Sequence, residues 1–145
     1  MKILILNGPN LNTLGLREPD VYGSKTLEDI IHECQSFGKS LGVEIDAKQS
    51  NHEGLLIDWI QEAKGKYEAI IVNAGGFTHT SIAILDALRF YEGRVIEVHL
   101  SQIFKREEYR HHSYISEVAE GVICGFGWRG YLMAIEYLAK QQWIN

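Results

Sequence analysis

Short apolar runs alternate with amphipathic stretches along this chain of 145 residues. Five of the runs predict β-strands, and three of these are aliphatic segments closed by polar or glycine residues, as in strands that are buried on both faces. We expect the strands at residues 2–7, 43–49, 69–73, 95–100 and 121–125.

Between the strands, apolar residues recur three or four positions apart, which is the spacing of a helix with one buried face. In residues 26–41, Thr26 supplies a capping hydroxyl, acidic residues follow in the first turn, and Gly42 ends the helix. Three more helices are expected around residues 55–63, 82–91 and 132–138, with Gly65 and Gly93 ending the first two.

This alternation predicts the α/β class: a doubly wound, five-stranded parallel sheet with right-handed connections and helices on both faces. No repeat, linker or low-complexity segment divides the chain, so we expect residues 1–145 to form one domain. Ligands of such sheets bind outside the carboxyl ends of the strands. Functional side chains are therefore expected in the loops that follow the strands.

Polar side chains do gather after four of the five predicted strands. After the first strand alone, an ordinary long surface loop would explain them equally well. Four such loops meeting at one edge of the sheet form a stronger signal than any single motif. The side chains concerned are Asn10, Arg17, Tyr22, Gln49, Asn51, His52, Asn73, His79, His99, Ser101, Arg106 and Arg110.

Composition and charge reduce the range of functions and partners that the chain can have. A formal net charge of −5 argues against a nucleic-acid partner, because phosphate attraction needs a basic face. Cys34 and Cys124 lie in apolar stretches without C-x-x-C spacing, so we interpret them as reduced core residues. The first residues run straight into a strand, and no apolar run reaches the roughly 20 residues that cross a membrane. We expect a cytoplasmic protein without a membrane partner.

Three familiar signals are set aside. Residues 125–130 match G-x-G-x-x-G, but no acidic residue at the end of a later strand follows, so we expect a tight strand-to-helix turn. His111 and His112 are adjacent and therefore point in different directions, and no further ligand pattern completes a metal site. No G-x-S-x-G or P-loop motif occurs, and Lys48 near a strand end is explained by a solvated edge position.

Acid–base chemistry fits the remaining residues. His99 ends a buried strand and can donate a proton near neutral pH. Glu97 lies two residues earlier on the same face, so it can orient His99 or bind a neighbouring residue. Tyr22 is a poor base at its ordinary pKa of about 10, but a nearby guanidinium such as Arg17 would favour the phenolate. A helix-leading turn at Tyr22 and a solvated charge at Arg17 are the alternative interpretation.

Eight segments of the chain form a pattern in their order and spacing: 7–11, 17–19 with 22–23, 49–51, 73–76, 78–81, 97–101, 106–108 and 110–114. Together they resemble type II 3-dehydroquinate dehydratase, and the resemblance extends from residue 1 to the C-terminal helix. It implies a flavodoxin-like fold and trans-dehydration of 3-dehydroquinate to 3-dehydroshikimate without a cofactor.

The resemblance also implies roles in proton transfer. Tyr22 matches the base that takes a proton from the carbon next to the ketone, and Arg17 matches the arginine that supports the tyrosinate. Asn10 corresponds to the residue that steadies the enolate oxygen through a water. His99 matches the acid that protonates the departing hydroxyl. This division is chemically sensible, because the enolate must be stabilised and the β-hydroxyl needs a proton donor.

Other matched residues are expected to bind the substrate. Asn73 and the backbone of Leu100 and Ser101 correspond to carboxylate and hydroxyl binders, and His79 and Arg110 match residues that hold the ring hydroxyls.

The remaining matches concern support and assembly. Glu97 and Arg106 are expected to support this set. Asp86 corresponds to a residue that reaches in from a neighbouring subunit of a homododecamer built as four trimers. Gln102 and the pair 104–105 depart from the usual residues beside the carboxylate site, which bears on substrate affinity and not on the reaction.

Two other functions stay open at this point. A non-catalytic flavodoxin-like module would bind flavin or receive phosphate, but the loop after the first strand has Thr13 as its only hydroxyl before residue 22 and no acidic cluster accompanies it. A sugar or keto-acid isomerase on the same scaffold would share the enolate step and lack a leaving group. The resemblance itself leaves open whether the reaction serves aromatic biosynthesis or quinate breakdown.

Overall fold

A five-stranded parallel sheet forms the centre of the computed structural model, which describes residues 1–16, 20 and 23–140. The strand order is β2-β1-β3-β4-β5, so the chain starts inside the sheet and winds outward in both directions. This is the flavodoxin-like order, as predicted. The strands are β1 (Lys2–Asn7), β2 (Glu44–Gln49), β3 (Ala69–Asn73), β4 (Arg94–His99) and β5 (Gly121–Cys124).

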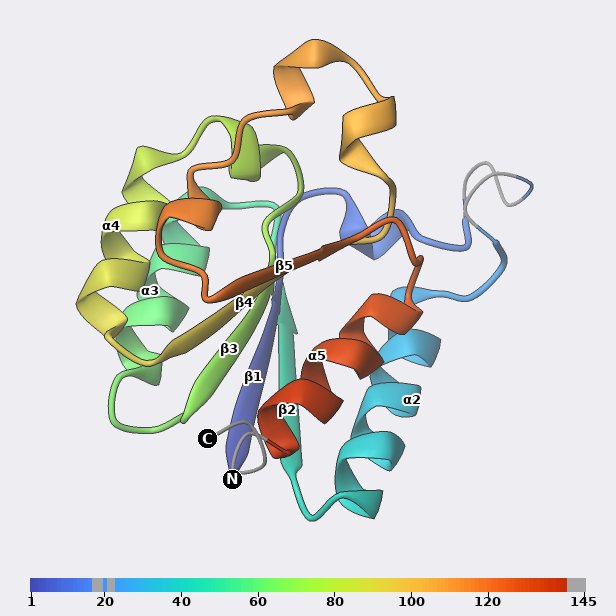
Figure 1. Ribbon diagram of the computed structural model, residues 1–145, viewed down its shortest axis with the longest axis vertical. Coiled ribbons are helices and arrows are strands. Elements are labelled where there is room, and N and C mark those ends of the chain that lie inside the picture. Colours follow the sequence, from blue (N-terminus) through green and yellow to red (C-terminus); the bar gives the residue numbers. More distant parts are fainter. Residues whose placement is uncertain (17–19, 21–22, 141–145) are drawn as a thin grey trace.

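Helices cover both faces of the sheet (Figure 1). One pair, α2 and α5, packs together on one face, and the other pair, α3 and α4, packs together on the opposite face. None of the described helices is long and apolar enough to span a membrane. The helices are α2 (Leu27–Ser40), α3 (Glu53–Ala63), α4 (Ile82–Tyr91) and α5 (Arg129–Ala139).

The burial of β1 on both faces explains why the central strands have continuous apolar sequences. Its residues alternate between two buried layers: Ile3 and Ile5 pack under α2 and α5, while Leu4 and Leu6 pack under α3 and α4. All four are at most 1% exposed. Burying such a side chain contributes roughly 1.5–3 kcal/mol, so both layers hold the strand in place. Its end, Asn7, is thereby fixed at the carboxyl edge.

The observed ends of α2 and α4 can be compared with the capping residues that the sequence predicted. Thr26 caps α2 as expected: its side chain accepts the N–H of Asp29, whose carboxylate accepts the N–H of Thr26 in return. Helix α4 ends differently, because Glu92 and not Gly93 is the left-handed C-cap, at φ 60°. The N–H of Glu92 donates to the carbonyl of Leu88 and so closes the last turn. This hydrogen bond offsets the energetic cost of a left-handed backbone at a residue other than glycine.

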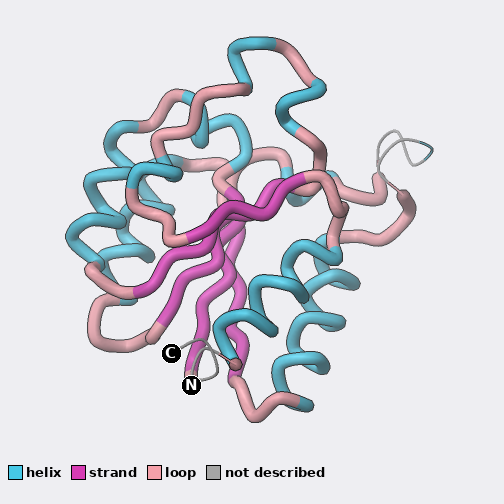
Figure 2. The backbone as a smooth tube through the Cα atoms, in the orientation of Figure 1, coloured by secondary structure: helices cyan, strands magenta, loops and turns pink. Residues whose placement is uncertain are grey.

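The connections at the carboxyl edge contain short helices that the sequence did not predict. Short 3-10 helices follow β1 at Leu11–Thr13 and β3 at Gly75–His79. The connection from β4 to β5 contains no α-helix, but three 3-10 helices at Ile103–Lys105, Glu108–Arg110 and Ile115–Glu117. Figure 2 shows this excursion rising above the sheet edge before it returns to β5. The sequence indicated no helix between residues 100 and 121, so these short 3-10 helices were not predicted.

Candidate active site

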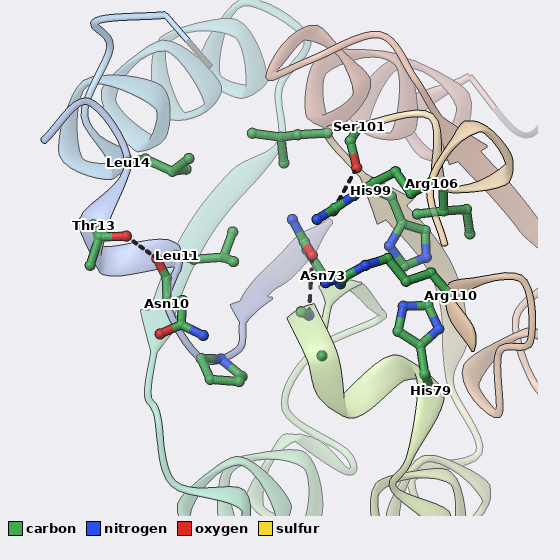
Figure 3. Close-up of a pocket in the computed structure, with 15 residues that line it drawn as sticks. Asn10, Leu11, Thr13, Leu14, Asn73, His79, His99, Ser101, Arg106 and Arg110 are labelled. Atoms are coloured by element: carbon green, nitrogen blue, oxygen red, sulfur yellow. Dashed lines mark hydrogen bonds between the residues drawn. The ribbon is translucent and has the colours of Figure 1, made fainter. Parts of the chain in front are cut away.

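A pocket of about 410 Å³ opens at the carboxyl edge of the sheet, where the loops after β1, β3 and β4 meet (Figure 3). Its volume suits a small metabolite. Most of its polar lining comes from residues that the sequence singled out, namely Asn10, Asn73, His79, His99, Ser101, Arg106 and Arg110, with Leu100 beside them. The edge predicted to carry function therefore contains a formed site.

Two glycines bring the loops after β1 and β3 close enough to share this pocket. A Cβ on Gly8 would lie 2.3 Å from the carbonyl oxygen of Ala74, and one on Gly75 would lie 2.9 Å from that of Pro9. No larger residue fits between these backbones. The N–H of Gly8 donates to the carbonyl of Asn73 at 2.8 Å, which continues the β1–β3 pairing into the loops. Asn10 and Asn73 therefore face one cavity.

His99 is the buried acid–base group of the site. It ends β4, is 5% exposed and lines the pocket. Its Nε2 hydrogen bonds to Oε2 of Glu97, which is one of the two contacts that the spacing left open. Since a carboxylate only accepts, Nε2 carries the proton, and Nδ1 is the nitrogen through which the ring can exchange a proton with a ligand.

Glu97 is held as a carboxylate by three donors. Besides His99, the hydroxyl of Ser113 donates to its Oε2 at 2.8 Å and the hydroxyl of Ser116 to its Oε1 at 2.6 Å. Burial alone would raise the pKa of Glu97, but the hydrogen bonds from His99, Ser116 and Ser113 outweigh it and hold the pKa below its ordinary value. The carboxylate is thus kept negative beside the imidazole.

A second histidine lies against the first. The rings of His79 and His99 are stacked with their centroids 6.4 Å apart. Nδ1 of His79 lies 2.7 Å from the carbonyl oxygen of His112, and because a carbonyl only accepts, Nδ1 carries a proton. Nε2 of His79 is then the nitrogen available to a ligand.

Two arginines make the pocket attractive to an anion. Arg106 donates to the hydroxyl of Ser101 at 3.2 Å, and Nε of Arg110 donates to Oε1 of Glu107 at 2.7 Å. Figure 3 shows both guanidinium groups on the side of the pocket where His79 and His99 lie. Among the described residues that line the cavity there is no aspartate or glutamate. The charged groups of this lining are therefore the two arginines, and Glu107, outside the lining, offsets part of their charge.

Asn10 is held at the opposite wall of the pocket. Its backbone is left-handed, with φ 71°, and its N–H donates to Oδ1 of Asn51 at 2.9 Å. Nε2 of Gln49 donates to the same oxygen at 3.2 Å. The polar residues after β2 thus shape the loop after β1, a role that the sequence pattern did not indicate.

Several predicted residues are not seen in the lining of this pocket. Glu97 lies behind His99, and the residues at the end of β2, Gln49, Asn51 and His52, do not line it either. Asp86 is exposed on α4 and does not line it. Arg17 and Tyr22 lie outside the described residues. Residues without an assigned role also line the pocket, and the signal that points to them is their place in the loops after β1, β3 and β4. They are Pro9, Leu11, Thr13, Leu14, Gly75, Gly76 and Ile103.

The signals that the sequence analysis set aside have structural explanations. Residues 125–128 form the turn from β5 into α5, and residues 129–130 begin that helix. Cys34 is fully buried between the sheet and α2, and burial raises the pKa of its thiol to about 12, with Glu33 adding to the shift. Within the described ranges, no three His, Cys, Asp or Glu side chains lie close enough together to hold a metal ion.

The fold and this site define a flavodoxin-like α/β enzyme in which a histidine backed by a carboxylate shares a pocket with two arginines. Residues 1–139 match the family model described as dehydroquinase class II. The chain belongs to this family.

Its relatives cover almost its whole length. It is 52% identical to 3-dehydroquinate dehydratase 2 of Pseudomonas aeruginosa over 96% of this chain and 94% of that protein. It is 55% identical to 3-dehydroquinate dehydratase of Bartonella bacilliformis over 96% and 88%. The crystal structure of type II dehydroquinase from Butyrivibrio crossotus superposes with a TM-score of 0.91 at 46% identity, covering 95% of this chain and 97% of that one.

Proposed function

We propose that this protein catalyses the trans-dehydration of 3-dehydroquinate to 3-dehydroshikimate through an enolate intermediate. The observation that carries the proposal is the buried pair of Glu97 and His99 at a pocket lined by two arginines and two histidines and, among its described residues, by no carboxylate. The substrate is a small ring with one carboxylate and several hydroxyls, which matches the size and charge of this pocket. Family membership supports the same reaction.

His99 is the general acid of the proposed reaction. With Nε2–H committed to Glu97, only Nδ1 of the cationic ring can give a proton to the substrate. That proton goes to the β-hydroxyl, whose C–O bond breaks, and the hydroxyl leaves as water while the enolate electrons form the new carbon–carbon double bond. The negative charge of Glu97 stabilises the imidazolium that must exist before this step.

The base half falls to Tyr22, which takes the proton from the carbon next to the ketone, with the guanidinium of Arg17 favouring its phenolate form. Both assignments rest on the sequence. Asn10 steadies the enolate oxygen through a water, and its place on the pocket wall opposite the histidines supports this role. Stabilising the enolate is necessary, because a proton next to a ketone is otherwise too weakly acidic to remove.

The remaining lining residues bind the substrate. Asn73 and the backbone N–H groups of Leu100 and Ser101 hold its carboxylate and a neighbouring hydroxyl. His79, through Nε2, and Arg110 hold the ring hydroxyls. Each of these residues lines the pocket.

Around this set, Arg106 supports the carboxylate side through its contact with Ser101. We also propose that residues 1–145 act as one catalytic domain, that no cofactor or metal takes part, and that the protein is a cytoplasmic homododecamer of four trimers. In that assembly, Asp86 of each chain would complete a neighbour's site.

The proposal is tested by adding 3-dehydroquinate to purified protein and following the ultraviolet absorbance of the conjugated enone. We expect absorbance to rise at a rate proportional to protein concentration. His99→Gln is the negative control. It keeps a polar side chain in place but cannot donate an acidic proton, so we expect almost no change in absorbance. No absorbance change at any pH near neutrality in the unmodified protein would overturn the proposal.

A further inference from the structure

Tyr131 places a phenol hydroxyl between two asparagine side chains at the carboxyl edge of the sheet. The hydroxyl donates to Oδ1 of Asn7 and accepts a hydrogen bond from Nδ2 of Asn73 at 3.0 Å. Asn7 and Asn73 are register partners at the ends of β1 and β3, while Tyr131 comes from α5, 58 residues beyond Asn73. Of these three residues, only Asn73 lines the pocket.

The hydrogen-bond pattern leaves Asn73 a single orientation. Its Oδ1 accepts the N–H of Gly75 at 3.3 Å, so its Nδ2 must face Tyr131. The hydroxyl of Tyr131 therefore accepts from Asn73, and its own proton goes to Asn7. Turning the Asn73 amide around would set its NH₂ group against the N–H of Gly75, two donors facing each other. The phenol and the backbone together define which atoms of Asn73 face a ligand.

Burial makes this arrangement rigid. Tyr131 is 0% exposed and packs in the apolar layer between the sheet, α2 and α5. Burial also raises the pKa of its phenol well above the ordinary value, so the hydroxyl keeps its proton throughout the working pH range. A hydroxyl that can neither ionise nor swing away holds the Asn73 amide in place before any ligand arrives, which reduces the entropic cost of binding.

We propose that Tyr131 is a positioning residue for substrate binding: through its hydroxyl it fixes the amide of Asn73, so that the second N–H and the remaining lone pair of that amide meet the substrate. Tyr131 does not line the pocket and acts only through Asn73. This inference rests on the proposed function of Asn73 as a binder of the substrate.

The test is a double-mutant cycle of Tyr131→Phe and Asn73→Ala on 3-dehydroquinate turnover. In the unmodified background, Tyr131→Phe should raise KM about tenfold, which corresponds to one hydrogen bond, and leave kcat within about threefold. In the Asn73→Ala background, the same substitution should change KM by less than about twofold.

Tyr91→Phe is the matched control. Tyr91 is a second buried tyrosine, and its hydroxyl donates to the carbonyl of Tyr67 at 2.8 Å in the other apolar layer. Its loss should lower stability to a similar degree and leave KM unchanged. An equal increase of KM for Tyr131→Phe in both backgrounds, or none in the unmodified one, would overturn the inference.

A measurement without substrate separates this inference from the reaction itself. The side-chain NH₂ resonances of Asn73, assigned by their loss in Asn73→Ala, should shift and exchange faster with water in ligand-free Tyr131→Phe. If the unmodified protein turned over no 3-dehydroquinate, the proposed function would fail while this test still applied. Unchanged Asn73 resonances in Tyr131→Phe would overturn the role of Tyr131 even in an active enzyme.

Discussion

Glu97 lies two residues before His99 on β4, and its carboxylate accepts the Nε2–H of that imidazole inside the protein. Side chains two residues apart on a strand point to the same face, so the strand itself pairs the two groups. The pairing leaves one ring nitrogen for the pocket and places a negative charge behind the other. This arrangement orients the ring and determines which of its nitrogens a ligand can reach.

Glu97→Gln should therefore lower kcat about 100-fold and change KM little, because an amide keeps the shape and one acceptor but loses the charge that stabilises the imidazolium. Steady-state kinetics on 3-dehydroquinate measure this. Glu108→Gln removes an exposed carboxylate from the connection between β4 and β5 and should have no effect. Equal losses in the two variants would show that Glu97 does not assist His99.

Ser116→Ala should make stability less dependent on pH in the acidic range. The folded pKa of Glu97 is lowered, so its stabilisation is present above the unfolded pKa of about 4.3 and is lost as pH falls through the folded pKa. Removing the Ser116 donor brings the folded pKa closer to the unfolded one. Urea unfolding at fixed protein concentration should show a loss of about 1 kcal/mol at pH 7 that shrinks below pH 4.

Ser40→Ala is the control for this measurement. The hydroxyl of Ser40 donates to the carbonyl of Phe37 at 2.6 Å, and its loss involves no carboxylate. Its effect on the free energy of unfolding should be the same at both pH values. If Ser116→Ala behaved in the same pH-independent way, Ser116 would not contribute to the lowered pKa of Glu97.

Tyr22→Phe should abolish most turnover and leave product binding nearly intact, because a phenyl ring keeps the contact surface but cannot take a proton. Arg17→Ala should act similarly. Product binding is measured by calorimetry and turnover by absorbance. Tyr137→Phe, whose hydroxyl bonds to Glu120 away from the pocket, should retain normal turnover. Near-normal turnover in Tyr22→Phe would mean that another residue is the catalytic base, and His79 would be the next candidate.

Activity should survive both chelation and borohydride treatment in the presence of substrate. The sequence has no ligand constellation for a metal and no lysine in an apolar pocket for a Schiff base. Lys48, the candidate near a strand end, lies 5.2 Å from the centre of the Trp59 ring and does not line the pocket. Inactivation by borohydride together with a stable mass adduct would contradict this prediction.

Mixed oligomers of Asp86→Ala with Tyr22→Phe should recover activity that neither variant has alone. Asp86 is exposed on α4 and does not line the pocket of its own chain, so its carboxylate is free to reach a neighbour's Arg110. In hybrids, some sites combine an intact Tyr22 with an intact Asp86 from the next chain. Mass spectrometry verifies mixing after joint refolding. Mixed oligomers without recovered activity would identify Asp86 as an ordinary solvated helix charge.

Much of the fold was predictable because its signals are local. The aliphatic runs and the helical spacing predicted all five strands and the four long helices, with ends displaced by a few residues. Parallel strands align their carboxyl ends, so the polar residues after them had to share one edge. That is why His99, Asn73 and Arg110, far apart in the sequence, could be assigned to one pocket.

By itself, the sequence determined the sheet, its functional edge and the common face of Glu97 and His99, since periodicity establishes which face a side chain occupies. The tertiary structure decided that Glu97 pairs with His99. The sequence could not determine which distant side chains meet at that edge. Ser116 reaches Glu97 from a 3-10 excursion without a periodic pattern, and Tyr131 reads as an ordinary core residue of α5. Those partnerships depend on how far loops and helices approach the strand ends, and only packing in three dimensions decides that distance.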